Sequence, residues 1–271
     1  TLRDLVSAAA GHDDCILQPL TSDDAPARLA EVLVSQLSRI LDDLKGEGAE
    51  KLRQQLDLVN FILVSLQHRL GRDADSVDTV SPPAQILQAI HRQSSKPAMP
   101  ETGLALPWLF TAGKGSPSLL TELRRELAAC NQVDVLVSFI THSGVRKLLD
   151  ILHAITAMGS DGQPRTRVRV LTTTYTGATE ILALDELAGL PGCEIRVSLD
   201  GRRTRLHAKA WLFRRRTGFG SAYVGSANLS GAALMGGLEW TVKFTERGQP
   251  DLYERASAHF HVIGLENDAA P

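Results

Sequence analysis

A chain of 271 residues allows one large domain or two modest ones, and 43% hydrophobic with 22% charged residues is ordinary globular composition that excludes wholesale disorder. No apolar run approaches the roughly 18 residues that span a bilayer, which argues against a membrane protein. The formal net charge of -2 hides an asymmetry, because residues 1–100 carry 10 Lys and Arg against 14 Asp and Glu, whereas the remainder carries 19 against 17.

Three cysteines stand far apart, at Cys15, Cys130 and Cys193. This number and spacing fit neither a disulfide framework nor a set of zinc ligands, so we expect a reducing, cytoplasmic setting. No signal-peptide pattern opens the chain, and Thr1 in place of Met suggests a trimmed N-terminus.

The first hundred residues show helical periodicity. Apolar residues recur at three- and four-residue spacing, which predicts amphipathic helices over residues 26–44 and 52–71. A short third helix is expected at residues 84–91. We therefore expect a helical N-terminal region over residues 1–92, with a lid, a dimer arm and a docking surface all open as its role.

Residues 93–107 contain repeated X-Pro steps without periodicity, which predicts a linker. Strands then alternate with helices before several strands follow one another. This order predicts an α/β sandwich with a mixed sheet over residues 108–263. Residues 264–271 would be a tail or an interdomain boundary.

The elements of this α/β domain are expected from short apolar runs and from helical periodicity. Pro117 would be the first residue of a helix capped by Ser116. The helices are expected at residues 118–130, 143–157, 179–187 and 250–262, and the strands at 133–140, 167–173, 193–198, 206–213, 221–225 and 238–244. A threonine-rich run at residues 171–179 either lines a functional cleft or forms a plain strand-to-helix cap.

The strand expected at residues 206–213 carries His207 and Lys209, which would point to one face because residues two apart in a strand do so. An imidazole can attack phosphorus, and an ammonium can neutralise a non-bridging oxygen. His-x-Lys alone is a common pattern, so a structural role is the alternative.

The next apolar strand ends in Gly-Ser-x-Asn. The turn at Gly225 would bring Ser226 and Asn228 to the carboxyl end of that strand, where their polar groups and backbone N–H groups can hold phosphate oxygens. Eleven residues on, Glu239 is expected inside an apolar strand, where a carboxylate needs a partner. Pairing with the ring of His207 would satisfy it, and a solvent-facing edge strand is the alternative.

Basic residues surround the His-x-Lys strand. Between residues 196 and 216, eight Lys and Arg stand against one acid, Asp200, which indicates either a positive patch or a solvated strand face. The residues expected to contact nucleic-acid phosphates are Arg202, Arg203, Arg205, Arg214, Arg215 and Arg216.

Together, His-x-Lys, Gly-Ser-x-Asn and the following Glu resemble the phospholipase D superfamily, over roughly residues 102–263. The resemblance implies that His207 is the nucleophile, that Lys209, Asn228 and Ser226 bind phosphate, and that Glu239 orients the histidine. It also implies a phosphohistidine intermediate resolved by water, with a second histidine protonating the leaving oxygen. No metal and no cofactor are implied.

Two features depart from the family's pattern. The Asp that the full motif places seven residues after the histidine is Arg214 here. The family also needs two His-x-Lys motifs per active site, and this chain has one. The resemblance to single-motif bacterial nucleases of the superfamily therefore implies a homodimer in which two His207 residues face each other across a two-fold axis.

The runs at residues 137–140, 171–179 and 202–209 also resemble the N-terminal module of large bacterial helicase-like proteins, in which a phospholipase D-type domain precedes a DEAD/DEAH-type ATPase.

We therefore expect a metal-independent endonuclease that cleaves nucleic acid, DNA rather than RNA, and that belongs with an ATPase or helicase domain absent from this chain. A nucleic-acid-binding module that keeps the phosphate cradle without turnover is the alternative. A lipid phosphodiesterase is disfavoured because a second motif and a lipid-facing loop are missing.

Overall fold

The computed structural model describes residues 19–71, 79–85, 100–111, 117–199 and 205–266, the last six of these by their backbone alone. The chain forms two compact units, residues 1–86 and residues 87–271. Among the helices in these ranges, none combines the length and the apolar character needed to cross a membrane.

The first unit contains two helices, α2 (Ala25–Asp43) and α3 (Gly48–Arg69). The side chains of Lys51 and Gln55 on α3 donate hydrogen bonds of 2.7 and 3.0 Å to carbonyl oxygens at the end of α2. Neither helix fully buries a side chain. The two predicted helices are confirmed, and the third, expected at residues 84–91, falls almost entirely outside the described residues.

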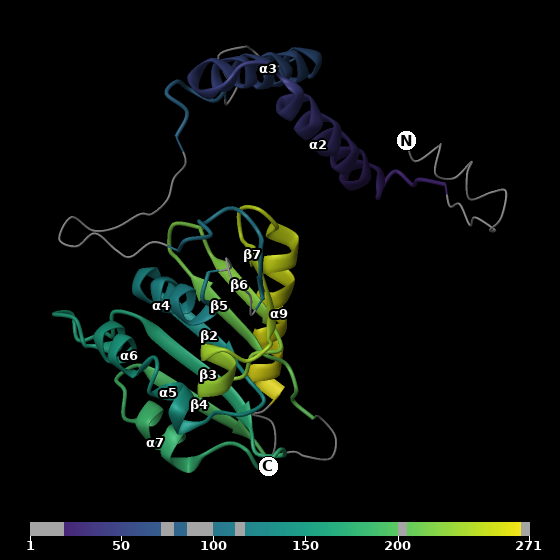
Figure 1. Ribbon diagram of the computed structural model, residues 1–271. Helices are drawn as coiled ribbons and strands as arrows, with labels where there is room; N and C mark the ends of the chain where they lie inside the picture. The colour runs from purple at the N-terminus through teal and green to yellow at the C-terminus, as the bar shows by residue number, and fades with distance from the viewer. Residues whose placement is uncertain (1–18, 72–78, 86–99, 112–116, 200–204, 267–271) are drawn as a thin grey trace. The chain divides into compact units, whose positions relative to one another are not determined.

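The second unit is built on one seven-stranded mixed sheet (Figure 1). Its strands are β1 (Trp108–Thr111), β2 (Gln132–Leu136), β3 (Arg167–Thr173), β4 (Cys193–Ser198), β5 (Ala210–Arg214), β6 (Ser221–Gly225) and β7 (Trp240–Thr245). Across the sheet they lie in the order β1-β7-β6-β5-β2-β3-β4. The pairs β2–β3 and β3–β4 are parallel, and the other pairs are antiparallel.

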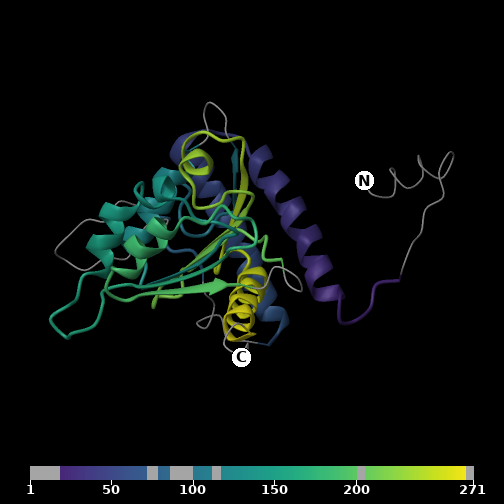
Figure 2. The same ribbon diagram turned by 90° about the horizontal axis from the view of Figure 1, so that it is seen from below.

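Helices cover both faces of this sheet (Figures 1 and 2). One face carries α4 (Leu119–Ala129), α5 (His142–Val145), α6 (Leu149–Thr156), α7 (Ile181–Ala188) and α8 (Gly231–Met235), and the other carries α9 (Pro250–Glu266). Because side chains alternate along a strand, Phe213 joins the larger core under α4–α8, while its neighbour Leu212 packs in the smaller core with Tyr253 and Phe260 of α9. The predicted α/β sandwich with a mixed sheet and a preceding helical region is confirmed.

The strands that hold the candidate site differ from their predicted bounds. The strands β3, β4 and β6 have the expected bounds, but β5 begins at Ala210 and β7 at Trp240. His207, Lys209 and Glu239 therefore precede their strands instead of lying within them. The strand β2 ends at residue 136 instead of 140.

The helices differ from expectation in two places. The helix expected at residues 143–157 is two helices, because hydrogen bonds between residues three apart at positions 147 and 148 interrupt the α-helical pattern. The helix α4 begins at Leu119 after Pro117, and its cap is Ser118, whose side chain accepts a hydrogen bond from the backbone of Thr121. Ser116, the predicted cap, is outside the described residues. Neither β1 nor α8 was predicted.

Candidate active site

His207 and Lys209 lie in the segment that leads into β5. His207 is exposed, whereas Lys209 is only 6% exposed. The Nζ atom of Lys209 is 3.1 Å from Nδ1 of His207 and donates hydrogen bonds to the His207 carbonyl oxygen (2.7 Å) and to Oγ of Ser138 (2.9 Å). The lysine side chain thus folds back onto the histidine, although neither residue is in a strand.

The surroundings of Lys209 affect its charge. Burial lowers the pKa of Lys209, because an ammonium is less stable away from water, and the nearby negative charge of Glu239 partly opposes this shift. An ammonium has three N–H donors, and the structure offers it three acceptors. A phosphate oxygen that binds Lys209 must therefore replace one of these acceptors.

The turn after β6 lies beside this pair. The backbone N–H of Gly225 donates to the Lys209 carbonyl oxygen (3.1 Å), which joins the turn to the lysine segment. A Cβ atom at Gly225 would collide with the backbone of Trp240 and Thr241 on β7. The glycine of Gly-Ser-x-Asn is therefore required by the close approach of two strands.

Asn228 is held by the loop that follows β2. Its Oδ1 atom accepts hydrogen bonds from the backbone N–H groups of Ser138 (3.1 Å) and Phe139 (3.3 Å). These bonds occupy the carbonyl end of the side chain, so the amide nitrogen is the end that can donate to a phosphate oxygen. Sequence reasoning missed Ser138, whose side chain and backbone connect Lys209 to Asn228. The sequence feature that could have identified Ser138 is a polar residue at the end of a run of buried strand residues.

Glu239 stands just before β7 and is partly buried. Its carboxylate accepts a hydrogen bond from Oγ of Ser226, which also accepts one from the backbone N–H of Trp240 (3.1 Å). Among the described residues, the hydrogen-bond partner of this carboxylate is Ser226 and not the ring of His207. The negative charge of Glu239 acts on Lys209, whose pKa it raises against the effect of burial.

The threonine-rich run forms the connection between β3 and α7, in which the residue at the N-cap of the helix is Glu180. The hydroxyl of Thr173 donates to the Ser198 carbonyl oxygen (2.9 Å), and that of Thr179 donates to the Thr173 carbonyl oxygen (2.6 Å). Both hydroxyls are thus used to join β3 to β4 and to the start of α7. Of the two readings of this run, the structural one fits.

The described arginines among those predicted to contact nucleic acid do not all lie near His207. Arg205 is exposed close to it in the chain, and Arg202 and Arg203 lie outside the described residues. Arg214 is the last residue of β5, and Arg215 and Arg216 follow it at the opposite edge of the sheet. Five residues separate Lys209 from Arg214, which corresponds to about 17 Å of extended chain.

Arg214, which replaces the motif Asp, is part of an ion-pair cluster. Its Nε atom is 3.0 Å from Oδ2 of Asp134, whose Oδ1 lies 2.7 Å from Nε of Arg169. Asp134 is fully buried, and Arg214 also donates to Oγ of Ser257 on α9. Among the described residues, no hydrogen bond or ion pair joins this cluster to His207, Lys209 or Glu239.

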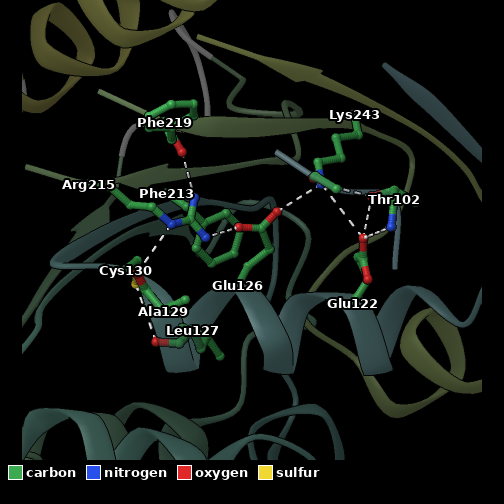
Figure 3. A network of polar contacts seen from close by, with 12 residues as sticks. Thr102, Glu122, Glu126, Leu127, Ala129, Cys130, Phe213, Arg215, Phe219 and Lys243 are labelled. Atoms are coloured by element: carbon green, nitrogen blue, oxygen red, sulfur yellow. Dashed lines mark hydrogen bonds and ion pairs between the residues drawn. The ribbon is translucent and has the colours of Figure 1, made fainter. Parts of the chain in front are cut away.

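Arg215 is a buried structural residue. Figure 3 shows its guanidinium against Glu126 of α4, which lies 3.0 Å from Nζ of Lys243. Lys243 in turn lies 3.6 Å from Glu122, so that two cations and two carboxylates balance inside the protein. Burial acts to raise the pKa of Glu126, but the charges of Arg215 and Lys243 outweigh it, and the pKa is lowered. With a side chain only 6% exposed, Arg215 is not a surface contact for nucleic acid.

The described cysteines and possible metal ligands add little to the chemistry that this site can perform. Burial raises the pKa of the Cys130 thiol to about 12 and that of Cys193 to about 11, which leaves both as neutral thiols at neutral pH. Within the described ranges, no group of three or more His, Cys, Asp or Glu side chains is placed to hold a metal ion.

No protein-family model matches the sequence, and no curated protein matches it. Among solved structures, the chain is similar to NucT from Helicobacter pylori, with 16% identity over 60% of this chain and 96% of that one and a TM-score of 0.45. It is also similar to Nuc from Salmonella typhimurium, described as a phospholipase D family member (15% identity, 58% and 91% covered, TM-score 0.39). A third similar structure is the polyphosphate kinase of Porphyromonas gingivalis, with 15% identity over 61% of this chain and 26% of that one and a TM-score of 0.41. These likenesses are distant.

Proposed function

We propose that this chain is a phospholipase D-type phosphodiesterase that cleaves nucleic acid, DNA in particular, as an endonuclease. The observation that carries the proposal is the convergence of His207 and Lys209, which share one segment, with Asn228 from another segment, at one edge of the sheet. Lys209 contacts the imidazole directly and is joined to Asn228 through Ser138. An exposed imidazole beside a buried ammonium and an amide donor is suited to phosphoryl transfer.

The first chemical step would form a covalent phosphohistidine. A non-bridging phosphate oxygen would replace Nδ1 of His207 as the third acceptor of Lys209. Nδ1 could then hold the ring proton, with Glu239 as its acceptor after a change of rotamer, and Nε2 would keep its lone pair for attack. The Nε2–P bond forms as the bond from phosphorus to the leaving oxygen breaks, and Asn228 donates to the charge that develops on phosphate.

The second step would return the histidine to its free state. In the first step the leaving oxygen takes a proton from a second imidazolium, for which we propose His207 of a second subunit. The neutral ring then takes a proton from water as the water oxygen attacks phosphorus and the P–N bond breaks. The products are a phosphomonoester and a hydroxyl, and no metal takes part in either step.

An exposed apolar face beside the site supports a homodimer. Leu109, Val242 and Val224 are register partners on β1, β7 and β6, so their side chains share one face of the sheet. Trp240 lies on the same face two residues before Val242, and these four side chains are 41–67% exposed. Exposed apolar patches of this kind mark contact sites. Because Trp240 is hydrogen-bonded to Ser226, a second copy bound to this patch would border the His207 site.

The chain would serve as the nuclease module of a larger helicase-like protein, which the runs at residues 171–179 and 202–209 support. A binding module without turnover is the second candidate. It is favoured by one observation, the bond of Glu239 to Ser226 where a bond to His207 was expected.

Cleavage in the presence of EDTA tests the proposal. The full chain would be incubated with plasmid and with single-stranded DNA, alongside His207→Ala and the control His153→Ala, which alters an exposed histidine on α6. We expect cleavage by the wild type and by the control, and a loss of about a thousandfold or more in His207→Ala. Binding of DNA without cleavage by the wild type, over a range of salt and pH, would favour the binding module instead.

Mixing tests whether two subunits share one site. Wild type and His207→Ala would be co-expressed in equal amounts, and the whole resulting population of dimers would be assayed. If one site needs both histidines, about a quarter of the wild-type activity should remain, whereas independent sites would leave about half. Light scattering that shows only monomer at micromolar concentration would contradict the homodimer.

A further inference from the structure

A cavity lined by five arginines lies at the edge of the sheet opposite His207. It has a volume of about 370 Å³ and is lined by Arg165, Arg167 and Arg214–Arg216, together with amide side chains that include Asn131 and Gln132. No lining residue is a histidine, cysteine or carboxylate. The cavity therefore offers positive charge and hydrogen-bond donors without a nucleophile.

The sheet brings these arginines together. Gln132 at the start of β2 is the register partner of both Arg167 on β3 and Arg214 on β5. Two strand spacings place the Cα atoms of these arginines about 10 Å apart. Asn131 joins the segments, because its backbone bonds to Arg214 (2.9 Å) and Arg167 (3.1 Å) and its Oδ1 accepts from the backbone of Arg216 (3.0 Å).

The charge in the cavity is not balanced by its surroundings. Arg214 shares the carboxylate of Asp134 with Arg169, so this cluster alone has an excess positive charge. Arg165, Arg167 and Arg216 are exposed, and none of them forms an ion pair with an acidic group in the described residues. Like charges held close together favour the binding of an anion.

We propose that this cavity binds a phosphomonoester group, either the terminal phosphate of a nucleic-acid strand or the phosphate of a free nucleotide. A phosphomonoester carries about −1.5 to −2 charge and three acceptor oxygens, which concentrates the charge in one place. A phosphodiester strand spreads single charges along its length, whereas these arginines are gathered around one hollow. Guanidinium groups match phosphate oxygens with paired donors, so Arg165, Arg167 and Arg216 are the ligands.

Binding measurements on defined strands test this site without relying on cleavage. In the His207→Ala background, fluorescence anisotropy would compare a 12-nucleotide DNA with phosphates at both ends against the same strand with hydroxyls at both ends. We expect the phosphorylated strand to bind about tenfold more tightly or better. The triple change Arg165→Gln, Arg167→Gln and Arg216→Gln should abolish that preference. Arg255→Gln, which removes one exposed arginine on α9, should keep it.

A second arm identifies the source of the phosphate. Calorimetry on the otherwise wild-type chain would compare AMP with adenosine, before and after the triple change. Binding of AMP that is lost in the triple variant identifies a nucleotide site, whereas a preference seen only with the strand identifies a strand-end site.

Equal affinity for phosphorylated and unphosphorylated strands together with no binding of AMP would overturn the proposal, as would a triple variant that keeps full phosphate preference. Circular dichroism checks the fold of the triple variant, and if it is lost, Arg167→Gln alone is compared with Arg255→Gln. These outcomes are independent of nuclease activity, because a protein that never cleaves DNA can still prefer a terminal phosphate.

Discussion

The two edges of the α/β sheet both present positive side chains, but they differ in what stands beside the charge. At the edge with His207, one buried ammonium contacts an imidazole, and a carboxylate and an amide lie close by. At the opposite edge, five arginines line a cavity whose other side chains are amides and a proline. The first arrangement contains an imidazole, a group that can act as a nucleophile and change its protonation state, whereas the second offers only positive charge and hydrogen-bond donors.

This difference changes how Arg214 is interpreted. In the sequence it follows His207 by seven residues and interrupts the family motif. In the fold it belongs to the arginine edge, where Asp134 and Ser257 hold it. Arg214 therefore belongs to an ion-pair cluster and lines the cavity at that edge, while His207 and Lys209 lie at the other edge.

Breaking the dimer should affect the His207 edge most strongly. Trp240→Glu places a charge in the exposed apolar face, and we expect a monomer that has lost cleavage by about a hundredfold or more, because each half-site would lack its second histidine. Light scattering and the cleavage assay would measure both effects. Leu182→Glu, at an exposed apolar position on α7, is the control and should remain dimeric and active. Full activity in a monomeric Trp240→Glu would refute the shared site.

Removing the Asp134 carboxylate, which Arg169 and Arg214 share, should lower the stability of the protein at the arginine edge. Asp134→Asn leaves Arg169 and Arg214 without their charged partner, and we expect the free energy of unfolding to fall by about 3 kcal/mol. Urea denaturation followed by tryptophan fluorescence would measure this. Asp150→Asn breaks the exposed pair with Arg124 and should cost less than about 1 kcal/mol. A large fall in kcat per folded molecule of Asp134→Asn would mean that the two edges are coupled after all.

Neutralising Glu239 should produce the smallest effect and reveal its electrostatic role. We expect Glu239→Gln to lower kcat about tenfold while DNA affinity changes little. The negative charge of Glu239 supports the protonated form of Lys209, so its removal lets the pKa of Lys209 fall further. The alkaline limb of the kcat/KM profile should therefore move to lower pH.

A pH series on wild type, Glu239→Gln and the exposed-site control Glu254→Gln would measure that shift. An alkaline limb that stays in place, or losses that are equal in kcat and in DNA affinity, would contradict the role assigned to Glu239.

How well each helix or strand was predicted depended on its burial and its length. The strands β3 and β6 were predicted with their observed bounds because their apolar runs are short and end in clear turns. The strand β1 and the helix α8 were missed, since four and five residues are too few to show a period. The boundary of β5 was misplaced because the alternation of Leu206 to Phe213 continues through a segment that is not paired as a strand.

The amino-acid sequence by itself predicted the candidate site residues. His207, Lys209, Asn228 and Glu239 were recognisable because each has a chemical property that phosphate chemistry needs and because their order and spacing resemble a known pattern. Sequence also predicted the α/β class, since apolar periodicity follows from which faces are buried.

Only the tertiary structure decided which residues are neighbours. Ser138 is 71 positions from Lys209 and yet accepts its hydrogen bond, whereas Arg214 is five positions away and lies at the other edge of the sheet. The physical reason is the strand itself, because β5 advances by about 3.3 Å per residue and carries adjacent sequence apart, while sheet pairing brings distant strand ends together. The described basic residues of one run in the sequence are in this way divided between the edge that holds His207, a buried ion-pair network and an arginine-lined cavity.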